Sequence, residues 1–166
     1  MVWESALGSA IEVAIAIAGF SGIVAVVGQR GAGHWTEADQ LRLRILLTAS
    51  GVALIFAFTP FLLIDWIDSS LVWRITSGLL ALHFAGITIH RIRQASASGI
   101  ADAIGLRPLN LVLQGAVISL LLANALWFAS ASIYVLGVLW SLFIAFMTFV
   151  ALLLETPHQG SRSGAS

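Results

Sequence analysis

Cysteine and lysine are both missing from this chain of 166 residues. Without cysteine the chain can form no disulfide, iron–sulfur cluster or thiol-based zinc site, and it has no thiol nucleophile. All eight basic residues are arginines. A Schiff base with retinal or pyridoxal phosphate is therefore excluded, because both need a lysine amine.

Charge of either sign is also scarce. Only 10% of the residues are charged and 59% are hydrophobic, whereas soluble domains average about 25% charged residues. The mean hydropathy is +0.98. A core of this size cannot hide so much apolar surface from water, so we expect the lipid bilayer as the main partner. The net charge is zero, which gives no field for binding nucleic acid.

Apolar runs close to 20 residues long predict membrane crossings. The sequence therefore predicts an all-α integral membrane protein with a bundle of five transmembrane helices. The crossings are expected over residues 8–27, 43–64, 71–92, 108–128 and 133–154. Residues 1–155 are expected to form one transmembrane domain, followed by a disordered cytoplasmic tail over 156–166.

The arginines predict the orientation of these crossings, because cytoplasmic loops carry an excess of arginine and lysine. One side of the predicted bundle has a single arginine, Arg74. The other side has Arg30, Arg42, Arg44, Arg91, Arg93, Arg107 and Arg162. We therefore expect the N-terminus outside and the C-terminus in the cytoplasm. The N-terminal flank has an acid and no basic side chain, so the first run is expected to be a retained helix and not a signal peptide.

One stretch resembles the start of some small bacterial multi-pass proteins of uncharacterised function. It reads GFSGIVAVVGQR and is followed by Trp35, Asp39 and the segment LRLRILL. The resemblance implies residence in the bacterial inner membrane. It carries over no catalytic residue and no cofactor.

Glu12 is an acid inside the first apolar run. At 100° per residue, a narrow helix face collects Ser5, Gly8, Glu12, Ala16 and Gly19. A charge turned to lipid at the centre of a membrane helix costs at least about 2.5 kcal/mol. We therefore expect Gly8, Ala16, Gly19 and the nearby Gly22 to pack on other helices, with Glu12 buried there or facing a wet cavity.

Three charged residues are expected on the same outer side as Glu12, namely Arg74, Asp65 and Asp68. Together with Glu12 they could line an ion pathway, or they could form a structural network that locks the first and third helices together. Both interpretations stay open at this point, because Glu12 lies only about one turn inside its apolar run.

Polar residues inside the other runs predict hydrogen bonds between helices, with a place along a pathway as the alternative. These residues are His83, Asn124 and Gln114. Haem or quinone binding through His83 is a further alternative. Intrachain bis-histidine haem is disfavoured, since His90 is on the same predicted helix. No metal site is predicted, and no cofactor is otherwise expected.

Packing signals recur in the second and fifth runs. Small-residue ridges are predicted from Ala49, Ala53 and Ala57, and from Tyr134, Gly137, Ser141, Ala145 and Thr148. Pro60 removes one backbone donor and crowds the carbonyl of Phe56, which predicts a kink. An aromatic belt at the outer interface is predicted from Trp3, Trp66, Trp73, Trp127 and Trp140.

Three classes of function fit these features. The first is a small oligomeric membrane protein with a channel- or transport-like role. The second is an accessory or structural subunit of a larger membrane complex. The third is an intramembrane redox protein that binds haem or a quinone. The partner is accordingly expected to be a further copy of the chain or a membrane complex. Enzymatic activity stays open and is less expected than a role without catalysis. Because most of the loops are too short to hold a catalytic domain, any activity is expected within the bundle, at its surface or in a partner.

Overall fold

The computed structural model describes residues 2–30, 37–98 and 108–155, and all regular secondary structure over these residues is helical. The helices are α1 (Val2–Arg30), α2 (Glu37–Leu63), α3 (Ser69–Ser98), α4 (Pro108–Ala123), the π-helix η1 (Asn124–Phe128) and α5 (Ala131–Glu155). The predicted tail over 156–166 lies outside the described residues.

Among the described residues, five helices are long and apolar enough to cross a membrane, which confirms the predicted number of apolar helices. Their candidate spans are Val2–Val24, Gln40–Leu63, Ser69–Arg93, Leu109–Phe128 and Ala131–Ala151. The first span begins earlier than the predicted crossing, because the apolar side chains of Trp3, Ala6 and Leu7 extend it toward the N-terminus. Glu12 is near the middle of this candidate span, which is assigned by length and composition over the described residues. Its depth in a membrane stays a prediction.

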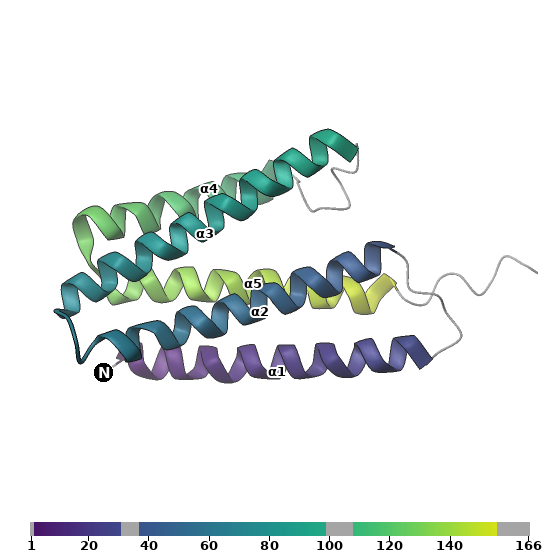
Figure 1. The fold of residues 1–166 in the computed structure, drawn as a ribbon, viewed down its shortest axis with the longest axis horizontal. Helices are drawn as coiled ribbons and strands as arrows, with labels where there is room; N and C mark the ends of the chain where they lie inside the picture. Colours follow the sequence, from purple (N-terminus) through teal and green to yellow (C-terminus); the bar gives the residue numbers. More distant parts are fainter. Residues whose placement is uncertain (1, 31–36, 99–107, 156–166) are drawn as a thin grey trace, which may run out of the picture.

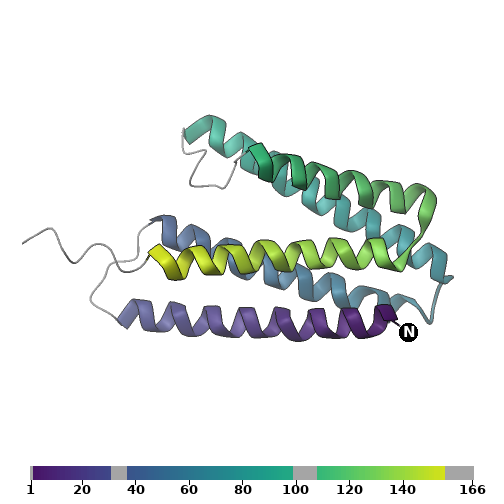
Figure 2. The same cartoon turned by 180° about the vertical axis from the view of Figure 1, so that it is seen from behind.

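The helices form two groups (Figure 1). Helices α1, α2 and α5 lie side by side in one group, and the α3–α4 hairpin forms the other. The same arrangement is seen from behind in Figure 2. The two groups meet at the end where the chain starts and diverge toward the opposite end. The N-terminus, the α2–α3 turn and the α4–α5 turn all lie at the first end, which we call the N-terminal end.

Small residues let the helices of the first group approach closely. On α2, Ala53 and Ala57 are buried, as the alanine ridge predicts. On α5, Ser141 and Ala145 are buried, and the Ser141 hydroxyl donates a hydrogen bond to the Ala49 carbonyl over 3.1 Å. The small residues of α2 and α5 thus form a close contact between these two helices.

Gly137 makes the close contact between α5 and the second group. A Cβ atom at this position would lie 2.9 Å from Leu121 of α4 and 2.9 Å from Leu80 of α3. Real Cβ atoms do not approach other heavy atoms so closely. A larger residue at Gly137 would therefore force the side chains of Leu80 and Leu121 to shift.

Candidate functional site

Glu12 points away from the rest of the chain. Its side chain is exposed, and no hydrogen bond or ion pair of Glu12 is found with the described residues. The helix turns its opposite side, with Leu7, Ala10 and Ala14, into the core. The structure thus leaves an ionisable group near the middle of a candidate span, on the outer surface of the single chain.

The small residues around Glu12 are also unpacked. Ser5, Ala16 and Gly19 are exposed and Gly8 is half-buried. A Cβ atom built at Gly8, Gly19 or Gly22 would meet nothing within 4 Å. The expected packing of this stripe on other helices is therefore not met within one copy of the chain. It stays a prediction for an assembly.

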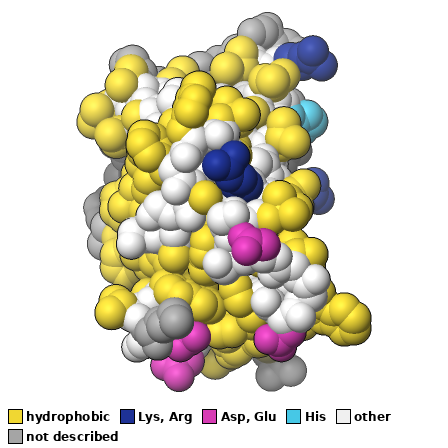
Figure 3. Space-filling view, turned by 90° about the vertical axis from the view of Figure 1, so that its left-hand side faces the viewer, with side chains coloured by type: hydrophobic (Ala, Val, Ile, Leu, Met, Phe, Trp, Pro, Cys, Tyr) yellow, Lys and Arg dark blue, Asp and Glu magenta, His cyan; other side chains and the backbone are white. Residues whose placement is uncertain are grey.

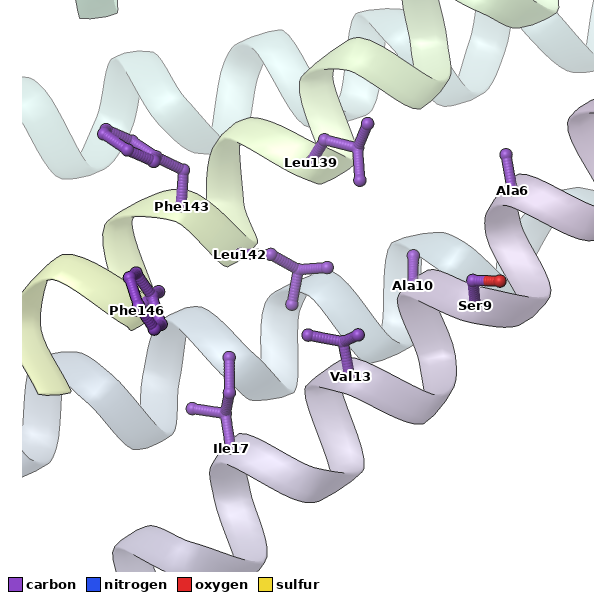
Figure 4. Close-up of a pocket in the computed structure, with 9 residues that line it drawn as sticks. All are labelled: Ala6, Ser9, Ala10, Val13, Ile17, Leu139, Leu142, Phe143 and Phe146. Carbon is purple, nitrogen blue, oxygen red and sulfur yellow. The ribbon is translucent and has the colours of Figure 1, made fainter.

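A shallow apolar groove runs beside this stripe, between α1 and α5 (Figure 4). It has a volume of about 340 Å³. From α1 it is lined by Ala6, Ser9, Ala10, Val13 and Ile17, and from α5 by Leu139, Leu142, Phe143 and Phe146. Ser9 supplies the only hydroxyl among these lining residues. The groove accordingly fits hydrocarbon or apolar side chains better than a polar solute.

The charged residues predicted to join Glu12 are not brought together by ion pairs within the described part of the chain. Arg74 is exposed and donates a hydrogen bond to the Leu126 carbonyl over 3.1 Å. Asp68 accepts a hydrogen bond from the backbone N–H of Ser70 over 2.8 Å, and Asp65 is exposed. Figure 3 shows this end of the molecule, where a few acidic and basic groups are spread over a mostly apolar surface.

Asp68 carries the clearest electrostatic effect outside the candidate spans. Hydrogen bonds from the side chain and then the backbone of Ser70 lower the pKa of Asp68, because they favour the charged carboxylate. The same contacts cap the start of α3 next to Ser69 and Ser70. Asp68 thus has a local role as a capping residue at the start of α3.

Asn124 holds the α4–α5 turn on α3. Its amide nitrogen donates to the Ser77 hydroxyl over 2.8 Å and to the Ser130 carbonyl over 2.9 Å. Its amide oxygen accepts from the Ser130 N–H over 2.7 Å. The turn needs this support because Ala129 has a left-handed backbone, with a φ of 51°, which is unfavourable for a residue with a Cβ atom.

Gln114 links α4 to α5. Its side-chain oxygen accepts a hydrogen bond from the indole nitrogen of Trp140 over 2.6 Å. Both Gln114 and Asn124 therefore make hydrogen bonds between segments of the bundle that are distant in sequence. Within a membrane such bonds satisfy groups that lipid cannot.

Tyr134 has a structural role that the sequence prediction missed. Its hydroxyl donates a hydrogen bond to the Phe56 carbonyl over 2.5 Å. Phe56 is the residue four positions before Pro60, which has no N–H to donate to it. The only tyrosine of the chain thus supplies the donor that α2 lacks. The spacing of Pro60 and Phe56 predicts the free carbonyl, but only the fold identifies its partner.

The predicted tryptophan belt needs a correction. Trp73 is only 6% exposed and lies in the core, with its ring centroid 4.9 Å from Trp3 and 5.8 Å from Tyr134. Phe61 completes the cluster, 5.7 Å from Trp3. These rings pack together because α1, α2, α3 and α5 all bring an aromatic side chain to the N-terminal end. Trp66 and Trp127 are exposed, as a belt requires.

His83 has two aromatic rings close to its own ring. Its ring centroid is 5.9 Å from Phe56 and 6.2 Å from Phe84. Its Nε2 atom is buried and has no hydrogen-bond partner among the described residues. His90, two turns further along α3, is exposed. No group of three or more metal-ligating side chains is found in the described ranges.

Comparisons with protein-family models, with curated proteins and with solved structures find no match for this chain. Glu12 is an ionisable group inside a candidate span that the single chain leaves exposed and, among the described residues, without a hydrogen bond or ion pair.

Proposed function

We propose that this chain is a multi-pass protein of a bacterial inner membrane, with its N-terminus outside and its C-terminus in the cytoplasm. The distribution of arginine supports this orientation. Arg42 and Arg44 near the start of α2, and Arg91 and Arg93 near the end of α3, belong to helix ends on the same side of the bundle. Arg74 is near the start of α3, at the N-terminal end. A cytoplasmic location fits the arginine-rich side.

We further propose a transport-like role in an oligomer, with Glu12 as the group that handles a proton or another cation. The observation that supports this role is the exposed carboxylate of Glu12 near the middle of the candidate span of α1. Ionisable residues at such depth generally line substrate or ion pathways. Acidic side chains gathered from different copies of one chain can select cations in a channel.

Purified protein in liposomes tests this role. Flux of protons and of monovalent cations is followed with entrapped fluorescent indicators, for the wild type and for Glu12→Gln. The amide keeps the shape of the side chain and removes its charge and its titration. We expect Glu12→Gln to abolish the flux, and we expect Glu4→Gln, an exposed acid at the start of the same helix, to leave it unchanged.

Two results would contradict the proposal. Equal flux in the wild type and in Glu12→Gln would show that the Glu12 carboxylate is not part of a cation pathway. If the wild type gives no flux and instead co-purifies with a fixed partner protein, the chain is an accessory subunit of a membrane complex.

A further inference from the structure

We infer that a second copy of this chain docks on the face of α1 formed by Ser5, Gly8, Glu12, Ala16 and Gly19, called here the Glu12 face. The inference deepens the proposed function by placing the contact between copies, and it rests on that function only for the role of the carboxylate. Contacts among the described residues leave most of this face uncovered, whereas the opposite side of α1 is buried.

The spacing of the Glu12 face suits a helix pair that crosses at Glu12. Gly8 and Ala16 stand one turn before and after it, and Ser5 and Gly19 stand two turns before and after it. Small side chains on both sides of the crossing point let two helix backbones approach over several turns. Two copies inserted in the same orientation are related by a two-fold axis along the membrane normal, so each residue near the axis faces the same residue of the other copy and Glu12 faces Glu12 at the crossing point.

The structure also leaves room for this approach. Cβ atoms at Gly8 and Gly19 would meet nothing of the same chain within 4 Å. The groove between α1 and α5 continues the uncovered surface beyond the Glu12 face, through Ser9 and Val13 to Phe143 and Phe146. An approaching copy can therefore contact α5 as well as α1.

The charge of Glu12 favours a second copy over lipid as the occupant. Hydrocarbon offers no partner for a carboxylate, and leaving one there costs at least about 2.5 kcal/mol. Two copies of Glu12 at a two-fold axis can share one proton or bind one cation between them, because two nearby carboxylates do not ionise independently. The contact thus removes the Glu12 carboxylate of each copy from lipid and brings the two carboxylates together.

Single-cysteine cross-linking in membranes tests this contact directly, since the natural chain has no cysteine. Ala16→Cys places a thiol on the Glu12 face. Leu82→Cys, on the lipid-accessible side of α3 and 67% exposed, stands at a similar distance from the start of its own helix and is the matched control. Under mild oxidation we expect Ala16→Cys to run mainly as a disulfide-linked dimer and Leu82→Cys to stay monomeric.

A second variant separates docking from folding. Gly19→Ile adds a bulky side chain where the single chain has open space, so the fold should persist while the dimer is lost in native mass spectrometry from nanodiscs. Equal cross-linking at Ala16 and Leu82, or a monomeric wild type, would overturn the docking inference. So would a dimer that withstands Gly19→Ile.

The two proposals fail in different ways. If Ala16→Cys forms a cross-linked dimer but the protein gives no cation flux, the interface is supported and the transport role is contradicted. If the protein is monomeric and Glu12→Gln still abolishes its flux, the pathway through the carboxylate is supported and the interface is contradicted.

Discussion

The chain has two stripes of small residues that look alike in sequence and lie in opposite surroundings. On α5, Gly137, Ser141 and Ala145 are buried against the other helices. On α1, Gly8 is half-buried, and Ala16 and Gly19 are exposed, with open space where a larger side chain would stand.

The difference between the stripes shows what this pattern can predict. Small residues at helical spacing indicate that two backbones approach closely in lipid, but they do not name the partner helix. For α5 the partners are α2, α3 and α4 of the same chain. For α1 we propose a second copy. Three substitutions test whether the two stripes differ in this way.

The largest effect is expected from Gly137→Leu, on the α5 stripe. A Cβ atom alone would lie 2.9 Å from both Leu80 and Leu121, and overpacking a core costs about 1–3 kcal/mol or more. We expect a strong loss of stability, measured by thermal unfolding in detergent with tryptophan fluorescence. An unchanged unfolding temperature would show that α5 does not approach α3 and α4 as described.

A smaller effect is expected from Tyr134→Phe, at the start of the α5 stripe. It removes the donor to the Phe56 carbonyl, and an unsatisfied buried acceptor costs about 1–3 kcal/mol. Pro60→Ala restores an N–H within α2, so Tyr134→Phe should cost less in that background. The measurement is a double-mutant cycle of unfolding free energies, and equal costs in both backgrounds would contradict the assigned role of Pro60.

The smallest effect is expected from Gly8→Ala, on the α1 stripe. Nothing in the chain obstructs the added methyl group, and alanine is more favourable than glycine within a helix by up to about 1 kcal/mol. We expect a slight gain in unfolding free energy for the monomer in detergent. Gly137→Ala is the matched control and should lose stability. A loss at Gly8 in the monomer would mean that the α1 stripe packs within the chain.

The number and approximate limits of the helices could be predicted from apolar runs, because run length alone sets the scale of a membrane helix. The burial of Trp73 could not be predicted from the sequence, because it depends on aromatic rings that α1, α2 and α5 bring to the N-terminal end. The π-helix at Asn124–Phe128 was also missed. No glycine marks the left-handed residue Ala129, and the turn is held by bonds of Asn124 to Ser77 and Ser130.

For the candidate site, the helical spacing of the Glu12 face was predictable from sequence, whereas its exposure was not. Periodicity shows which side chains share a face, but only the positions of α2 and α5 decide which side of α1 they cover. Among the described residues no ion pair joins Glu12 to Arg74, Asp65 or Asp68, and a pathway or a network formed by these groups stays a prediction. Equal sidedness along the membrane normal does not make side chains neighbours.

The grouping of α1 and α2 with α5 has a consequence for biosynthesis. The hydrogen bond from Ser141 to the Ala49 carbonyl joins residues 92 positions apart, and Tyr134 reaches Phe56 across 78 positions. The ribosome therefore completes the α3–α4 hairpin before the helix that closes the first group exists. Until α5 has been synthesised, the buried alanines of α2 and the carbonyl of Phe56 lack the partners that α5 gives them in the complete fold.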